Sequence, residues 1–172
     1  MIILITGASH TGKTFLSQKL LEKYHFPSLS IDHLKMGLIR SGNTALTPLS
    51  PDGELTKYLW PITREIIKTA LENKQNLIVE GVYVPENWHL DFSPEEREEI
   101  RFYCLVLTQN YIKKHFDKIK SNACIIENRL EDEITPEGVI SDNEDFLARF
   151  QKAGHPCLLI EEEYDFLSQV NI

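Results

Sequence analysis

Residues 7–14 carry the pattern G-x-x-x-x-G-K-[ST], and every fixed position of that pattern is matched. The pattern lies between two segments of different periodicity. Residues 2–5 are a continuous apolar run, which is typical of a strand that is buried on both faces. Residues 13–24 place Leu16, Leu20 and Tyr24 on one face of a helix. The chain is therefore predicted to run from strand to glycine-rich turn to helix, and no other feature constrains the fold as strongly.

A turn of this kind at the start of a helix is suited to holding phosphate groups. Gly7 and Gly12 let the backbone approach phosphate oxygens without an interfering Cβ. Successive amides point inward, and the helix dipole adds positive potential. Lys13 brings an ammonium to the β- and γ-phosphates, and the Thr14 hydroxyl is a ligand for Mg²⁺. The sequence thus predicts a P-loop that binds ATP and Mg²⁺, made of Gly7, Ala8, Ser9, His10, Thr11, Gly12, Lys13 and Thr14.

Short apolar runs alternate with helical patterns along the rest of the chain, which indicates a parallel α/β sheet. The predicted strands are residues 2–5, 28–31, 77–79, 101–107 and 157–160. The predicted helices are residues 13–24, 33–40, 60–73 with Pro61 in the first turn, 112–126, 146–150 and a short one around Phe166. Residues 41–54 contain prolines and glycines and are predicted to form a loop. Residues 130–142 are polar and carry Pro136 and Gly138. The expected fold is a three-layer α/β/α P-loop NTPase fold with a five-stranded parallel sheet.

Composition narrows the class of partner. The chain of 172 residues is expected to form a single domain, residues 1–172. Its net charge of −8 argues against nucleic acid and anionic membranes as partners. The 3 cysteines are widely spaced and form no metal-binding pair, which suits a reducing cytoplasm. A cytoplasmic monomer or homodimer is therefore expected.

Other P-loop classes fit less well. A GTPase needs Asn-Lys-x-Asp to read guanine, and Asn73-Lys74-Gln75-Asn76 lacks the final aspartate. Motor, helicase and transporter ATPases are usually much larger. Acidic residues after the second and third predicted strands indicate a different activity.

With its P-loop, its size and its order of elements, the sequence resembles the nucleoside-monophosphate-kinase-like small-molecule kinases. This group includes shikimate kinase, gluconate kinase, chloramphenicol phosphotransferase, the zeta-toxin group and 2-phosphoglycerate kinase. The resemblance extends over nearly the whole chain as an order of elements, but only the P-loop is specific as a motif. It implies phosphoryl transfer from ATP to the hydroxyl of a small acceptor.

In this group the second strand commonly delivers an aspartate to the acceptor site. Asp32 lies at the predicted carboxyl end of that strand, where it could accept the proton of the attacking hydroxyl. The alternative is an N-cap for the following helix. Arg40 lies where relatives use a basic residue to bind an anionic acceptor, and the alternative is a solvated helix end.

Two residues near the third strand are further candidates. Glu80 ends an apolar strand, as a Walker-B acid does, although the usual residue is aspartate; it could hold Mg²⁺ through water or contact the acceptor. Tyr83 belongs to a predicted acceptor-side loop, residues 82–85. The Gly-aromatic-Pro-Arg motif of kinases for AMP or CMP is absent, which argues against a nucleoside monophosphate acceptor.

A lid is expected around residues 121–142, because relatives close a short segment over ATP and bring arginines to the phosphoryl group. Arg129 is the only arginine there and is the predicted catalytic lid residue, beside Lys13 and Asp32. Its alternative role is an i,i+4 partner of Glu133. A lid poor in arginine leaves two rival functions open: a nucleotide-binding regulatory or toxin–antitoxin-type protein with little turnover, and a simple ATPase.

Overall fold

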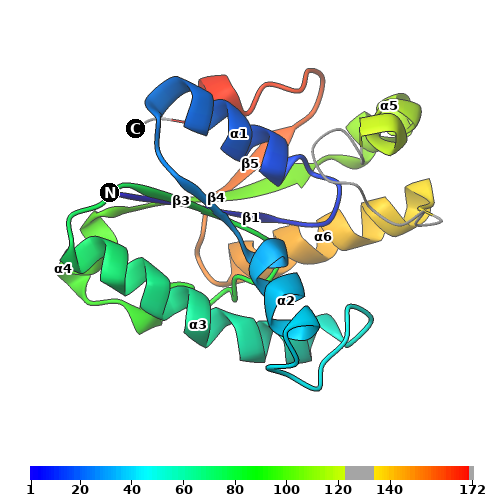
Figure 1. Ribbon diagram of the computed structural model, residues 1–172. Coiled ribbons are helices and arrows are strands. Elements are labelled where there is room, and N and C mark those ends of the chain that lie inside the picture. The colour runs from blue at the N-terminus through cyan, green and yellow to red at the C-terminus, as the bar shows by residue number, and fades with distance from the viewer. Residues whose placement is uncertain (123–133, 171–172) are drawn as a thin grey trace.

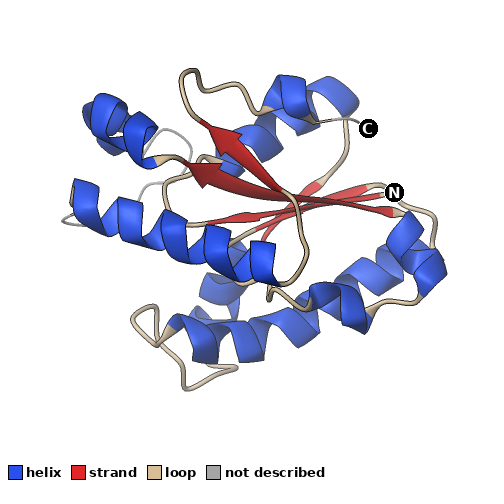
Figure 2. Cartoon of the chain, turned by 180° about the vertical axis from the view of Figure 1, so that it is seen from behind, coloured by secondary structure: helices blue, strands red, loops and turns tan. Residues whose placement is uncertain are grey.

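A computed structural model describes residues 1–122 and 134–170. Five parallel strands form one sheet in the order β2-β3-β1-β4-β5, and helices cover both of its faces (Figures 1 and 2). The strands are β1 (Ile2–Gly7), β2 (Ser28–Ser30), β3 (Leu77–Glu80), β4 (Ile100–Leu107) and β5 (Cys157–Ile160). The predicted three-layer fold with a five-stranded parallel sheet is confirmed.

The central strand explains the apolar run at the start of the sequence. β1 pairs with β3 on one side and with β4 on the other, so that Ile2 has Leu77 and Ile100 as its partners. Helices lie above and below it, and all of its residues are buried. A strand that is covered on both faces has no need for polar alternation.

Six helices and two short 3₁₀ turns complete the part of the chain that the structure describes. They are α1 (Lys13–Tyr24), α2 (Ile31–Arg40), α3 (Asp52–Glu72), η1 (Trp88–Asp91), α4 (Pro94–Glu98), α5 (Gln109–Asn122), α6 (Pro136–Lys152) and η2 (Leu167–Gln169). α1 and α5 pack against one face through residues such as Leu16 and Ile112. α3 and the last part of α6 pack against the other through residues such as Ile67 and Phe150. None of the described helices is long and apolar enough to cross a membrane.

The third helix is longer than predicted. α3 begins at Asp52, so Pro61 lies inside the helix and not in its first turn. A proline in a helix removes one N–H bond and normally bends or ends the helix. Here Pro61 is on the exposed face, where water can bond the carbonyl that it leaves unpaired. Leu55 and Leu59 on the opposite face are buried, and their burial keeps the first turns helical.

The helix predicted at residues 146–150 also begins earlier than expected. α6 begins at Pro136, a residue type that suits the first helical position because its missing N–H would be unbonded there anyway. The Thr135 side chain caps this helix by accepting a hydrogen bond of 3.1 Å from the Gly138 amide. η1 and α4 were not predicted, although a capping box formed by Ser93 and Glu96 starts α4.

Because the strands are parallel, their carboxyl ends all lie at one edge of the sheet, to which the β4 arrow in Figure 1 points. The loop after β1, the start of α2, the segment after β3 and residues 161–166 after β5 all begin at this edge. Ligands of open α/β sheets bind outside this edge.

Candidate functional site

The P-loop joins β1 to α1 through two glycines with positive φ angles, 149° at Gly7 and 80° at Gly12. A Cβ on Gly7 would overlap the carbonyl oxygen of Leu105 on β4, and it would lie 3.0 Å from Thr11 Oγ1. The loop therefore packs directly against the neighbouring strand, and its backbone conformation requires glycine at this position.

Two side chains converge on one carbonyl inside the loop. The Ala8 carbonyl accepts hydrogen bonds from Thr11 Oγ1 at 2.9 Å and from Lys13 Nζ at 2.8 Å. Lys13 is only 5% exposed, so its ammonium is held within the loop and does not extend into solvent. His10 at the turn has a φ of 65°, and Ser9 beside it is half-buried. A glycine-lined turn with an enclosed ammonium fits the phosphates of a nucleotide.

Glu80 lies on the face of the sheet that α1 covers. It ends β3, is 1% exposed, and has Ile5 and Ser30 as its register partners. Side chains alternate along a strand, so Glu80 shares a face with Ile78, which belongs to the core beneath α1. α1 begins at the same edge with Lys13 and Thr14, and Thr14 is half-buried. Within residues 1–122 and 134–170 no group of three or more His, Cys, Asp and Glu side chains forms a metal cage.

A buried serine lies beside Glu80. Ser28 Oγ on β2 is 2.6 Å from Ser17 Oγ on α1, which shows that these alternate β2 side chains face α1. Ser30, two positions later, faces the same way and is 8% exposed. No residue of the described part bonds its hydroxyl. A buried hydroxyl in this situation normally binds water or a ligand, and Ser30 was not predicted as a site residue.

Asp32, Lys35 and Tyr83 form a second cluster at this edge of the sheet. Lys35 Nζ lies 2.6 Å from Asp32 Oδ1 and donates a hydrogen bond of 2.9 Å to Tyr83 Oη. The ammonium is also 5.0 Å from the centre of the Tyr83 ring. The Lys35 side chain is 12% exposed and that of Asp32 26% exposed, so the ion pair is shielded from most of the solvent.

The cluster fixes the protonation of two of its members. Burial alone would lower the pKa of Lys35, but the hydrogen bonds to Asp32 and Tyr83 outweigh it and raise that pKa above its ordinary value. Burial raises the pKa of Tyr83, against the opposing effect of Lys35. Lys35 is therefore an ammonium and Tyr83 a neutral phenol. Because Tyr83 Oη accepts from Lys35, its own proton can be donated elsewhere.

Asp32 lies one element later than predicted. β2 ends at Ser30, α2 begins at Ile31, and Asp32 is in the first turn of α2. The N-cap position belongs to Ser30, so the alternative role of Asp32 as an N-cap is wrong. A carboxylate in the first turn still interacts favourably with the helix dipole.

Of the two predicted arginines, the structure describes Arg40 and does not bring it to this cluster. Arg40 ends α2, about 12 Å along the helix axis from Asp32, and is exposed. Arg129 lies outside the described residues, as do residues 123–133 of the lid predicted at residues 121–142. Residues 121 and 122 end α5, and α6 begins at Pro136.

Besides Ser30, sequence reasoning missed two residues of this edge, Lys35 and Tyr164. Lys35 could have been found, because it follows Asp32 at the i,i+3 spacing that brings side chains together on a helix. Tyr164, which contacts the P-loop, follows β5 with no local pattern to mark it: its hydroxyl donates a hydrogen bond of 2.9 Å to the Thr11 carbonyl.

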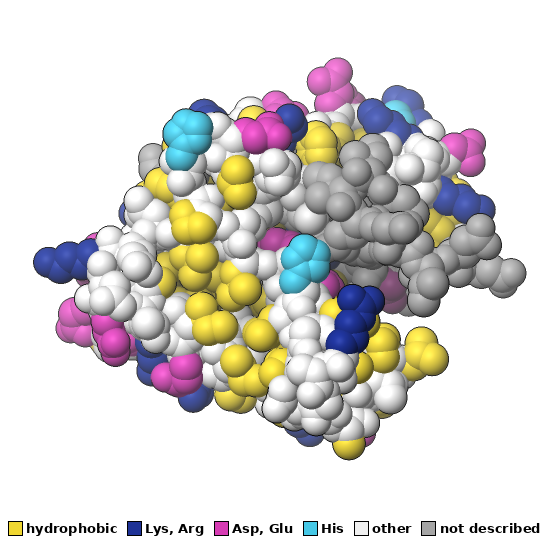
Figure 3. Space-filling model, in the orientation of Figure 1, with side chains coloured by type: hydrophobic (Ala, Val, Ile, Leu, Met, Phe, Trp, Pro, Cys, Tyr) yellow, Lys and Arg dark blue, Asp and Glu magenta, His cyan; other side chains and the backbone are white. Residues whose placement is uncertain are grey.

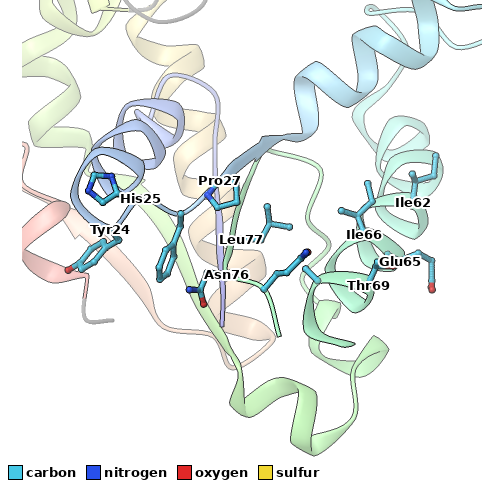
Figure 4. Close-up of a pocket in the computed structure, with 12 residues that line it drawn as sticks. Tyr24, His25, Pro27, Ile62, Glu65, Ile66, Thr69, Asn76 and Leu77 are labelled. Carbon is cyan, nitrogen blue, oxygen red and sulfur yellow. The ribbon is translucent and has the colours of Figure 1, made fainter. Parts of the chain in front are cut away.

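An apolar groove with a volume of about 850 Å³ lies at the opposite, amino end of the strands. Tyr24 and Pro27 line one side of it, Ile62 and Ile66 of α3 line the other, and Leu77 lies between them (Figure 4). Hydrophobic side chains also gather on the surface between α1 and α3 (Figure 3). The P-loop is at the far end of β1, so this groove does not belong to the site described above.

Comparison with family models and with curated protein sequences finds no match. Solved structures of kinases are similar. Shikimate kinase from Bacteroides thetaiotaomicron is 14% identical, with a TM-score of 0.53 over 96% of this chain and 90% of that one. Deoxyadenosine kinase from M. mycoides, with bound dATP, is 15% identical, with a TM-score of 0.52 over 98% and 94%.

A chain of the Pnkp1/Rnl/Hen1 RNA repair complex is 13% identical, with a TM-score of 0.54 over 95% of this chain and 49% of that one. At these identities the likeness establishes the fold. The chain shares the fold of P-loop kinases that resemble nucleoside monophosphate kinases.

Proposed function

We propose that this protein is a kinase that transfers the γ-phosphoryl group of ATP to a hydroxyl of a small molecule. The observation that carries this proposal is the placement of a phosphate loop and the cluster of Asp32, Lys35 and Tyr83 at the same edge of the sheet. Phosphoryl transfer depends on positioning, because donor and acceptor oxygens must lie in line. Two such sites at one edge of the sheet support a donor and an acceptor bound next to each other.

The P-loop residues, Gly7 to Thr14, would hold the triphosphate. Backbone amides bind the phosphate oxygens, and the enclosed Lys13 ammonium neutralises charge on the β- and γ-phosphates. Thr14 and Glu80 would hold Mg²⁺, Thr14 directly and Glu80 through water, and the buried hydroxyl of Ser30, the register partner of Glu80, would be a further donor for such a water. Bound with ATP, Mg²⁺ supplies charge neutralisation across the β- and γ-phosphates. Glu80 lies on the face of the sheet that α1 covers, and α1 begins with Lys13 and Thr14. This placement supports a role of Glu80 in metal binding more than a role in acceptor binding.

On the acceptor side, Asp32 would accept the hydroxyl proton. Lys35 binds one carboxylate oxygen, Oδ1, so the other can receive the acceptor hydroxyl. The Tyr83 phenol would donate a hydrogen bond to a second acceptor oxygen. Arg40 would contact an outer anionic part of a longer acceptor, and Arg129 would reach the phosphoryl group from the lid.

Several features support a small acceptor. Two kinases that share the fold, shikimate kinase and deoxyadenosine kinase, are named after small molecules. The net charge of −8 disfavours a nucleic-acid acceptor, although one similar chain belongs to an RNA repair complex. We also propose one kinase domain, residues 1–172, acting in the cytoplasm as a monomer or homodimer; the single sheet that all strands share supports the domain assignment.

The test is ADP release measured with ATP and Mg²⁺ and a panel of sugars, hydroxy acids and amino sugars. A kinase releases ADP only when an acceptor is added. Release at the same rate without an acceptor would indicate an ATPase, and no release would indicate a nucleotide-binding regulator. Lys13→Ala should abolish the release, whereas Lys19→Ala, on the exposed part of α1, should leave it unchanged.

A further inference from the structure

Tyr164 links the segment after β5 to the P-loop. Its hydroxyl donates a hydrogen bond of 2.9 Å to the Thr11 carbonyl, between residues 153 positions apart in the chain. Its ring packs edge-on against Phe15 with 6.0 Å between centroids, and against Phe166 with 5.1 Å. Phe166 is 1% exposed and belongs to the core beneath α1, so the Tyr164 ring is held in place by contact with a core residue.

The fit between Tyr164 and the loop is close. A Cβ on Gly12 would overlap the Tyr164 hydroxyl oxygen and approach its ring to 2.6 Å at Cζ. Gly12 is therefore required for two independent reasons, its positive φ of 80° and its contact with Tyr164. Burial raises the pKa of the Tyr164 hydroxyl, so the group remains a hydrogen-bond donor at any working pH.

The hydrogen bond acts on one particular peptide group. The Thr11 carbonyl and the Gly12 amide belong to the same planar peptide, and no cis peptide bond occurs among the described residues. In a trans peptide the C=O and N–H point in opposite directions. Holding the Thr11 carbonyl toward Tyr164 therefore aims the Gly12 N–H away from Tyr164.

We propose that Tyr164 is a positioning residue that holds the Thr11–Gly12 peptide with its N–H directed at the nucleotide phosphates. This inference rests on the proposed nucleotide-binding function of the P-loop. Tyr164 does not contact the reacting atoms; it pre-orients an amide that would otherwise have to be ordered when ATP binds. Pre-organisation of this kind increases affinity by reducing the cost of ordering the loop.

The test uses Tyr164→Phe, which removes the hydroxyl and keeps the ring. Its matched control is Tyr58→Phe, because Tyr58 Oη also donates a hydrogen bond of 2.9 Å to a backbone carbonyl, that of Asn43, away from the P-loop. Two readouts are compared: the affinity for ATP with Mg²⁺, and amide hydrogen exchange of peptides covering residues 7–14 in the nucleotide-free protein.

Tyr164→Phe should weaken ATP binding about 3- to 10-fold, as expected for one hydrogen bond, and should speed exchange in residues 7–14. Tyr58→Phe should do neither. A Tyr164→Phe variant with unchanged exchange in residues 7–14, or with unchanged ATP affinity, overturns the inference. If the wild-type protein binds no ATP, the proposed function fails; the exchange comparison then decides alone whether Tyr164 orders the loop.

Discussion

The two halves of the candidate site are built in different ways. The P-loop is a contiguous stretch whose shape is set mainly by its backbone conformation. Gly7 and Gly12 have positive φ angles, and the Ala8 carbonyl accepts two hydrogen bonds. The acceptor cluster consists of side chains, and its hydrogen bond from Lys35 to Tyr83 joins residues 48 positions apart. The P-loop conformation is encoded mainly by local sequence, with Tyr164 as a distant contact, whereas the acceptor cluster depends on how α2 packs against the segment after β3.

This difference implies that the halves should fail separately. Changes in the acceptor cluster should alter turnover and leave ATP affinity intact. Changes in the P-loop should alter ATP affinity first. The following substitutions test that separation.

Asp32→Asn should give the largest effect, a fall in kcat of about 10²–10⁴-fold, the usual contribution of a general base. ATP affinity should hardly change. The free energy of unfolding should fall by about 1 kcal/mol, because the carboxylate that pairs with Lys35 becomes neutral. Thermal melting serves as the control for folding. A fall of less than about tenfold would mean that Asp32 only orients the acceptor, as a loose transition state allows.

Gly12→Ala should weaken ATP binding about 100-fold. The matched control is Gly42→Ala. Gly42 has a similar φ, 74° against 80°, but apart from its chain neighbours no atom of the described residues lies within 4 Å of the place that its new methyl group would take. Left-handed strain of about 1–2 kcal/mol affects both variants. Overlap with Tyr164 adds about 1–3 kcal/mol in Gly12→Ala alone. Equal ATP affinity of the two variants in a titration would show that the P-loop tolerates a side chain there.

Lys35→Met should lower kcat/KM for the acceptor about 5- to 10-fold and the free energy of unfolding by about 1–2 kcal/mol, because Asp32 and Tyr83 both lose a donor. Lys19→Met is the control: Lys19 forms an i,i+3 pair with Glu22 at 2.9 Å, but both side chains are more than 40% exposed. That surface pair should contribute less than about 0.5 kcal/mol. If chemical denaturation shows the same loss in both variants, the Lys35 cluster has no special stability.

The smallest effect is expected at His155, which precedes β5 and contacts neither the P-loop nor the side chains of the acceptor cluster in any hydrogen bond of the described residues. His155 Nε2 lies 2.8 Å from the Glu86 carbonyl and 3.1 Å from His89 Nδ1. Burial lowers the pKa of His155, and the neighbouring His89 acts in the same direction. The unfolded chain therefore binds the extra proton first, as the pH falls through about 6.5.

The stability contributed by the neutral His155 ring is thus complete above that pH and is lost as the pH falls through the folded pKa. Unfolding by urea at about pH 7.5 and about pH 5.5 should show lower stability at the lower pH. His155→Gln should reduce this difference, and His33→Gln, at an exposed position, should not. ATP affinity measured in the same two buffers should be the same in the wild type and in His155→Gln.

Sequence alone was sufficient for elements whose signal is local. The buried run of β1, the bounds of α1 and the five strands needed only apolar periodicity and turn residues. It failed where tertiary packing decides: α3 continues through Pro61 because Leu55 and Leu59 are buried on the other face. In the site, the P-loop was recognisable as a motif, and Asp32 as an acid near a strand end. Tyr164 was not, because its partner Thr11 is 153 positions away.

The central claim is that the phosphoryl group passes to an acceptor and not to water. Its most direct test is ³¹P NMR of ATP, Mg²⁺, the wild-type protein and an acceptor found in the ADP-release screen. The account predicts a phosphomonoester resonance whose intensity corresponds to one phosphomonoester for each ADP formed, with little inorganic phosphate. It predicts no ADP when the acceptor is omitted. Inorganic phosphate formed in equal amount to ADP, with or without the acceptor, would contradict it.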